Sequence, residues 1–158
     1  RLDKMVNITN DPSILSSAGS LARDCGNFEQ SLVIFKNIED KAPHFRLWFK
    51  KDYAWTFLIS QYMEKIDNFD EAKFFINNQL DKQFKEDGIN EMWLIMLAYI
   101  ASVEGDTDKA KYYFNEQTKM TNPINVIWSN KYPDILDENP AFRDSFFSEL
   151  EKLGLKLK

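Results

Sequence analysis

The chain contains one cysteine, Cys25, and one histidine, His44, among its 158 residues. A single cysteine cannot form a disulfide within the chain, which favours a reducing compartment, and we expect a cytoplasmic protein. Metal sites built from soft ligands need several His or Cys side chains that converge, so we expect no metal site and no cofactor. Cys25, just before a predicted turn, is expected to pack as a small hydrophobe, and His44 to lie on the surface.

The chain also lacks an excess of positive charge. Its formal net charge is −5 and its sequence pI is about 5.0, whereas nucleic-acid binding needs clustered Lys and Arg that neutralise phosphates. The pair Lys50-Lys51 is followed by Asp52 and is interpreted as ordinary surface. No apolar run approaches the ~20 residues that a membrane-spanning helix needs. We therefore expect no direct contact with nucleic acid and none with a membrane.

Sequence motifs of catalysis are missing as well. No Gly-rich phosphate loop, G-x-S-x-G or H-E-x-x-H sequence occurs. The adjacent carboxylates Glu39-Asp40 and Asp137-Glu138 are expected at solvated helix ends rather than as an acid–base pair. Five glycines and five prolines are too few for the dense turns of a β-sandwich or barrel. The chain is expected to be all-α and not an enzyme.

What the chain does have is a repeated spacing of small residues. Three pairs are each twelve residues apart and each encloses a turn signal: Gly19 and Ser31, Ser60 and Ala72, Ala98 and Ala110. Apolar residues flank these turns at steps of three and four, the period of amphipathic helices. The pattern predicts three helix–turn–helix repeats, at about residues 12–43, 53–80 and 91–122. Asn27 with Gln30, and Asn68 with Glu71, have the form of a capping box at the second helix.

These repeats resemble the tetratricopeptide (TPR) pattern, W-x₂-L-G-x₂-Y followed by A-x₃-F and P over 34 residues. The first repeat matches at Leu15, Ala18-Gly19, Ala22, Ser31, Phe35 and Pro43, and the third at Leu94, Leu97-Ala98, Ala101, Ala110, Phe114 and Pro123. Gly19 and Ser60 are 41 residues apart. We expect the excess, around residues 45–52, to lengthen the first helix of the second repeat. The resemblance implies a right-handed superhelix within one domain over residues 1–158.

Residues 123–158 are expected to cap the last repeat. Asn122-Pro123 and Asn139-Pro140 each place a capping Asn before a Pro suited to a first helical turn. An apolar stripe follows on one helix face, at Phe142, Phe146, Leu150 and Leu153. Gly154 then supplies a left-handed stop. This ending, and the segment Pro43-x-x-x-x-Trp48-Phe49, resemble the C-terminal TPR regions of bacterial signalling proteins such as class III adenylate cyclases and winged-helix transcription regulators.

The resemblance also implies where a partner would bind, because the first helices of TPR repeats line a concave groove. By register, the groove residues of this chain are Arg23, Phe57, Gln61, Met92, Ile95 and Tyr99. The Lys and Asn set with which some TPR domains clamp acidic chaperone tails is missing, so a carboxylate clamp is disfavoured. Two occupants remain open. An apolar peptide or helix of a protein partner would suit this surface, and so would the chain's own C-terminal segment, including Ile127 and Trp128.

Two functions remain in play, with a protein or peptide partner in both. The resemblance implies a protein-interaction or regulatory module at the end of a longer bacterial signalling or transcription-regulatory protein. The alternative is a free-standing TPR adaptor or assembly factor. Formation of a homo-oligomer is left open, since one sequence does not give the oligomeric state.

Overall fold

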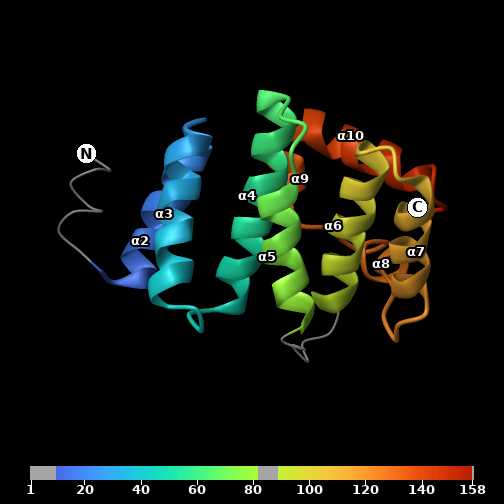
Figure 1. The fold of residues 1–158 in the computed structure, drawn as a ribbon, viewed down its shortest axis with the longest axis horizontal. Helices are drawn as coiled ribbons and strands as arrows, with labels where there is room; N and C mark the ends of the chain where they lie inside the picture. The colour runs from blue at the N-terminus through green and yellow to red at the C-terminus, as the bar shows by residue number, and fades with distance from the viewer. Residues whose placement is uncertain (1–9, 82–88, 158) are drawn as a thin grey trace. The chain divides into compact units, whose positions relative to one another are not determined.

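The computed structural model describes residues 10–81 and 89–157, and this part of the chain is helical without any strand (Figure 1). The all-α prediction is therefore confirmed. The helices are α2 (Pro12–Asp24), α3 (Phe28–Lys41), α4 (Leu47–Glu64), α5 (Asp70–Asp81), α6 (Ile89–Val103), α7 (Thr107–Thr118), α8 (Ile124–Ile127), α9 (Asp134–Glu138) and α10 (Pro140–Glu151). Within these described ranges, no helix is long and apolar enough to cross a membrane.

The chain divides into two compact units, residues 1–64 and residues 65–158. The first unit contains α2, α3 and α4, and the second contains α5 to α10. The boundary falls between the two helices of the second expected repeat, 53–80. A single domain over residues 1–158, and a TPR superhelix, therefore stay predictions.

In the first unit, α2 and α3 form a tight helical hairpin. Gly26 adopts a left-handed φ of +82°, and the Asn27 N–H donates to the Ala22 carbonyl at 2.8 Å. The Asn27 side chain then caps α3 by accepting from the Gln30 N–H, as predicted. Where the helices pack, Ser31 Oγ donates to the Gly19 carbonyl at 2.8 Å. The small side chains of Gly19 and Ser31 thus let α2 and α3 approach closely, as the spacing of the two residues predicts.

The hairpin of α6 and α7 in the second unit repeats this turn chemistry. Gly105 has a φ of +83°, and the Asp106 N–H donates to the Ala101 carbonyl at 2.9 Å. The Asp106 side chain accepts from the Lys109 N–H at the start of α7. Ala98 and Ala110 are fully buried. The first and third expected repeats are therefore built on the same type of left-handed glycine turn and side-chain cap.

Several predicted caps differ from the structure. The left-handed residue after α4 is Lys65, with φ +54°, and Asn68 accepts from the Asp70 N–H rather than from Glu71. Asn122 is not a cap, because α8 begins at Ile124 with Pro123 as its N-cap.

At α10, Asn139 is the N-cap residue and Pro140 the first helical residue, as predicted, but the Asn139 amide donates to the Ile135 carbonyl and makes no capping hydrogen bond. A side-chain amide has several geometrically accessible partners, and sequence spacing does not select among them. Gly154, with φ +117°, follows the end of α10 as predicted.

An aromatic core joins α3 to α4. The ring of Phe35 packs edge-on against Phe49 at 5.4 Å and in a tilted arrangement against Tyr53 at 5.8 Å, measured between ring centroids. Helix α4 begins at Leu47 and spans 18 residues, against 13 for α2. Its first turns carry this core, so the predicted lengthening at the front of the second pair is confirmed.

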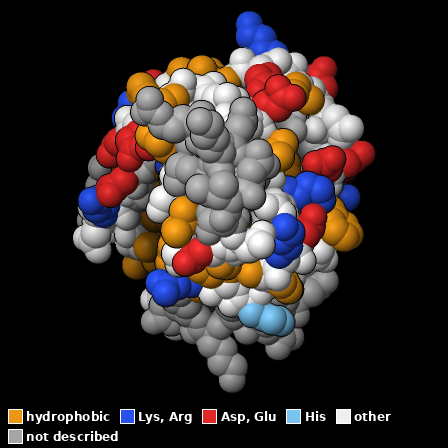
Figure 2. All heavy atoms as spheres, turned by 90° about the vertical axis from the view of Figure 1, so that its left-hand side faces the viewer, with side chains coloured by type: hydrophobic (Ala, Val, Ile, Leu, Met, Phe, Trp, Pro, Cys, Tyr) orange, Lys and Arg blue, Asp and Glu red, His pale blue; other side chains and the backbone are white. Residues whose placement is uncertain are grey.

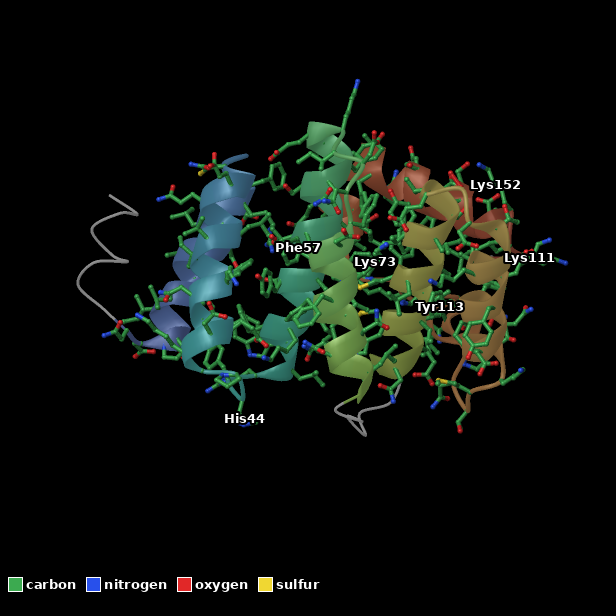
Figure 3. The ribbon with its side chains drawn as sticks, in the orientation of Figure 1. His44, Phe57, Lys73, Lys111, Tyr113 and Lys152 are labelled. Carbon is green, nitrogen blue, oxygen red and sulfur yellow. The ribbon has the colours of Figure 1, made fainter. Side chains whose placement is uncertain are left out.

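Helix α6 is the centre of the second unit. Its residues are buried from Glu91 to Ala101 without interruption, as expected for a helix that is apolar on all sides. It packs against α5, α7, α8 and α10. On the surface, Lys73 of α5 donates to both carboxylate oxygens of Glu104 at 3.1 Å, and this hydrogen bond raises the pKa of Lys73 (Figure 3).

Candidate functional site

The α6 part of the predicted groove is covered by the chain itself. Met92, Ile95 and Tyr99 are all buried. The ring of Tyr99 lies 5.7 Å from that of Phe142 and 4.9 Å from that of Phe146, both on α10. The Oγ of Ser102, one turn further along α6, donates to the Glu149 carboxylate at 2.8 Å. In this structure α10 therefore occupies the face of α6 that carries Tyr99.

The segment between α7 and α10 supports this cover. Trp128 packs against Phe146 at 6.2 Å and against Phe147 at 6.1 Å between ring centroids. Helix α8, which ends at Ile127, packs on α6. Of the two occupants considered for the groove, the C-terminal segment is the one that contacts Tyr99. A role of these residues in binding a foreign partner stays a prediction.

The α2 and α4 residues of the predicted groove take part in contacts within the first unit. Arg23 is only 10% exposed and forms an ion pair with Asp52 of α4 at 3.1 Å. Asp52 also accepts a hydrogen bond from Ser20. Phe57, labelled in Figure 3, is buried and stacks on Tyr53 at 4.8 Å between ring centroids. Gln61 is half-buried. Arg23 thus ties α2 to α4.

A different surface combines exposed aromatic and cationic side chains. It lies where α3 ends and α4 begins, and we call residues 41–51 the α3–α4 corner. Trp48 is 47% exposed on the first turn of α4, and His44 and Arg46 are exposed beside it in sequence. Figure 3 shows His44 at the corner, pointing away from the helices, and Figure 2 shows it at the molecular surface.

The exposed side chains of the corner rest on buried ones. Phe49 is fully buried, and the half-buried ring of Phe45 packs on it at 5.7 Å. Phe45 in turn contacts Trp48, edge to face, at 6.0 Å. The guanidinium carbon of Arg46 lies 5.8 Å from the centroid of the Phe45 ring, within the range of a cation–π interaction. The exposed side chains of Trp48 and Arg46 thus both contact the ring of Phe45.

Lys50 belongs to the same corner, but it is not the surface residue that the sequence suggested. It is 1% exposed, and its ammonium group donates to the Glu39 carboxylate and, at 2.7 Å, to the Pro43 carbonyl. A charged group can be buried in this way when a counter-charge and a hydrogen-bond acceptor accompany it. Lys50 thus links α3 to the connection that carries the exposed residues His44 and Arg46.

Comparison with known proteins decides nothing further about family. No protein-family model, curated protein or solved structure matches the chain. The TPR resemblance therefore stays a prediction.

Cys25 is exposed at the C-terminal end of α2, so the prediction that it packs as a small hydrophobe is wrong. Cys25 is the C-cap residue of α2 and lies beyond Ala22, the last buried residue of that helix. In the described part of the chain, no three His, Cys, Asp or Glu side chains are grouped as a metal ion would require.

Sequence analysis did not select the corner as a site, although its signals are visible in the sequence. Residues 41–51 contain no Asp or Glu, and they combine Trp48 with four Lys or Arg residues. What the sequence does not show is which of these side chains become buried. Phe49 and Lys50 do, whereas Trp48 and Arg46 do not.

Proposed function

We propose that this chain binds a polypeptide partner and acts as an interaction or regulatory module of a longer bacterial signalling or transcription-regulatory protein. The observation that supports binding is the exposure of Trp48 beside Arg46, with both side chains held by Phe45. Trp and Arg are the residue types most enriched among energetically dominant interface residues. Preorganised side chains lose less conformational entropy on binding. The corner therefore has the composition of an anchor point, and its contacts with Phe45 favour preorganisation of Trp48 and Arg46.

A capture experiment tests the binding. The full chain is immobilised, polypeptides retained from an extract of the source organism are identified, and each is purified and titrated against the chain by calorimetry. We expect saturable binding by at least one of them. Trp48→Ala should weaken that binding roughly tenfold or more, as loss of an interface anchor does.

The matched control is Phe74→Ala. Phe74 is an aromatic residue of α5 that is 71% exposed and lies outside the corner, so its removal should leave the affinity unchanged within about twofold. The proposal is contradicted if no retained polypeptide binds once purified. It is also contradicted if Trp48→Ala and Phe74→Ala have the same small effect.

The regulatory role is supported by the resemblance of the C-terminal residues to TPR regions of signalling proteins, and it is tested on the gene. We expect the full reading frame to encode an output domain, such as a cyclase or a winged helix, upstream of Arg1. A reading frame without one would instead favour the adaptor alternative.

A further inference from the structure

We infer that the α3–α4 corner binds an acidic polypeptide segment that carries an apolar or aromatic side chain among its carboxylates. The inference rests on the proposed function and names the chemistry of the partner at that site. It follows from three features of the corner: its charge relative to the rest of the chain, the engagement of the nearby carboxylates, and the exposed indole.

The charge of the corner is opposite to that of the remaining chain. Residues 41–51 hold four of the twenty Lys and Arg residues and none of the twenty-five Asp and Glu residues. The other residues therefore carry a formal charge of −9. Within the corner, Lys50 is paired with Glu39, while Lys41 and Arg46 are exposed and Lys51 is half-buried. The accessible charge at this place is positive.

The carboxylates adjacent to the corner in sequence are engaged with cations other than Lys41 and Arg46. Glu39 pairs with Lys50, Asp40 with Lys36 at 3.7 Å, and Asp52 with Arg23 at 3.1 Å. Lys41 donates to a neutral amide oxygen, that of Asn10, at 3.4 Å. Among the described residues, neither Lys41 nor Arg46 forms an ion pair. Both charges remain to be complemented by the carboxylates of a partner.

The apolar part of the partner is set by Trp48 and Phe45. Their edge-to-face pair presents a half-exposed indole next to the Arg46 guanidinium, so an apolar side chain of the partner can be buried against Trp48 while its neighbours meet the cations. The N-terminus of α4 lies in the same corner, and the positive end of the helix dipole adds to the attraction for carboxylates.

A polypeptide segment fits these features better than an extended anionic surface. Membrane recognition by basic clusters uses about four to eight Lys and Arg residues, and tight nucleic-acid binders make roughly six to ten phosphate contacts. The corner offers fewer accessible cations than either. A narrow acidic segment can contact the corner alone.

Fluorescence anisotropy with defined probes tests the inference on the full chain. The first probe is a short fluorescein-labelled peptide with glutamates on both sides of a Leu-Phe pair. The second has every glutamate replaced by glutamine. We expect the acidic peptide to bind at least about tenfold more tightly than the glutamine peptide, and to bind more weakly as salt is raised. Trp48→Ala should weaken binding roughly tenfold, and Arg46→Gln roughly fivefold.

The control variants are Phe74→Ala and Lys111→Gln, which remove an exposed aromatic and an exposed cation outside the corner. Both should change the affinity by less than about twofold. Circular dichroism checks that every variant is folded. If Trp48→Ala is unstable, the double variant Lys41→Gln with Arg46→Gln takes its place, because both of these side chains are exposed.

The inference is overturned if the two peptides bind equally, or if corner and control variants behave alike. It is also overturned if phosphatidylserine vesicles or a short DNA duplex bind more tightly than the acidic peptide. A captured partner that depends on Trp48 but is insensitive to Arg46→Gln and to salt would overturn the acidic chemistry and leave the proposed function standing. Absence of any polypeptide partner would overturn both.

Discussion

The buried ammonium group of Lys50 shows how a single residue holds the corner together. It has a carboxylate partner, Glu39, on α3 and a carbonyl partner at Pro43 in the connection to α4. Removing one member of a buried ion pair leaves the other without compensation, and the cost is larger when the charge left behind is the more deeply buried one. Lys50 is 1% exposed, whereas Glu39 is 19% exposed. The two ends of the pair should therefore respond differently to substitution.

We expect Glu39→Gln to lower the free energy of unfolding by about 3 kcal/mol, because the Lys50 charge would stay buried without a carboxylate. Lys50→Met should cost clearly less, since Glu39 is partly exposed and can be hydrated. Urea denaturation of both variants measures the difference. A larger loss for Lys50→Met than for Glu39→Gln would contradict this account of the pair.

Substitution of Gly19 by alanine tests how closely α2 and α3 approach, because it adds one methyl group where the two helices pack. A Cβ added at Gly19 would lie 2.4 Å from Cε1 of Phe35, a fully buried ring. Alanine improves helix propensity by about 1 kcal/mol, but overpacking a core costs about 1–3 kcal/mol. Because the Phe35 ring is enclosed, we expect overpacking to win and Gly19→Ala to destabilise the chain.

The measurement is the thermal midpoint of Gly19→Ala beside that of Ser17→Ala. Ser17 is exposed on the same helix, so its variant should keep or slightly raise the midpoint. If Gly19→Ala were as stable as Ser17→Ala, the helices would not pack as closely at Gly19 as described.

At the scale of elements, α10 acts as a cover for α6. Tyr99 is enclosed by Phe142 and Phe146, so Tyr99→Ala should leave a cavity and lower the free energy of unfolding by roughly 3 kcal/mol. Tyr112→Ala is the matched control, because Tyr112 on α7 is 59% exposed and its loss should cost less than about 0.5 kcal/mol. Equal effects of the two variants in urea denaturation would show that α10 does not enclose Tyr99.

The elements that the sequence predicted well are those determined by local chemistry. The hairpin turns at Gly26 and Gly105 each need only a left-handed residue and a capping side chain. In each turn these two residues are adjacent in the sequence. The burial of Tyr99 depends instead on Phe142 and Phe146, which are more than forty positions away in the sequence. Helical periodicity shows that a helix has an apolar face, but not which other helix packs against that face. The sequence therefore left the occupant of the Tyr99 surface open, and the groove residues themselves stay a prediction.

The corner was missed for a related reason. Trp48, Phe49 and Lys50 are consecutive, and which of them enters the core depends on the rotation of α4 against α3. The aromatic contacts of Phe35 on α3 with Phe49 and Tyr53 on α4 set that rotation. Only with this packing known do Trp48 and Arg46 become surface residues and Lys50 a buried one.

As a whole, the molecule is acidic and, in its described part, helical, and it carries an aromatic and cationic corner that we propose to bind a polypeptide. Long-range attraction would speed the encounter of an acidic segment with the corner, and repulsion by the remaining chain would disfavour its binding elsewhere. The charge asymmetry therefore predicts that the partner binds at residues 41–51.

Hydrogen–deuterium exchange of the full chain with and without its captured partner tests that claim most directly. The account predicts that partner binding slows amide exchange in residues 41–51, including the first turn of α4. Exchange in α7 and α8 should not change. Protection confined to α6 and α10, or no protection of residues 41–51 at saturating partner, would contradict it.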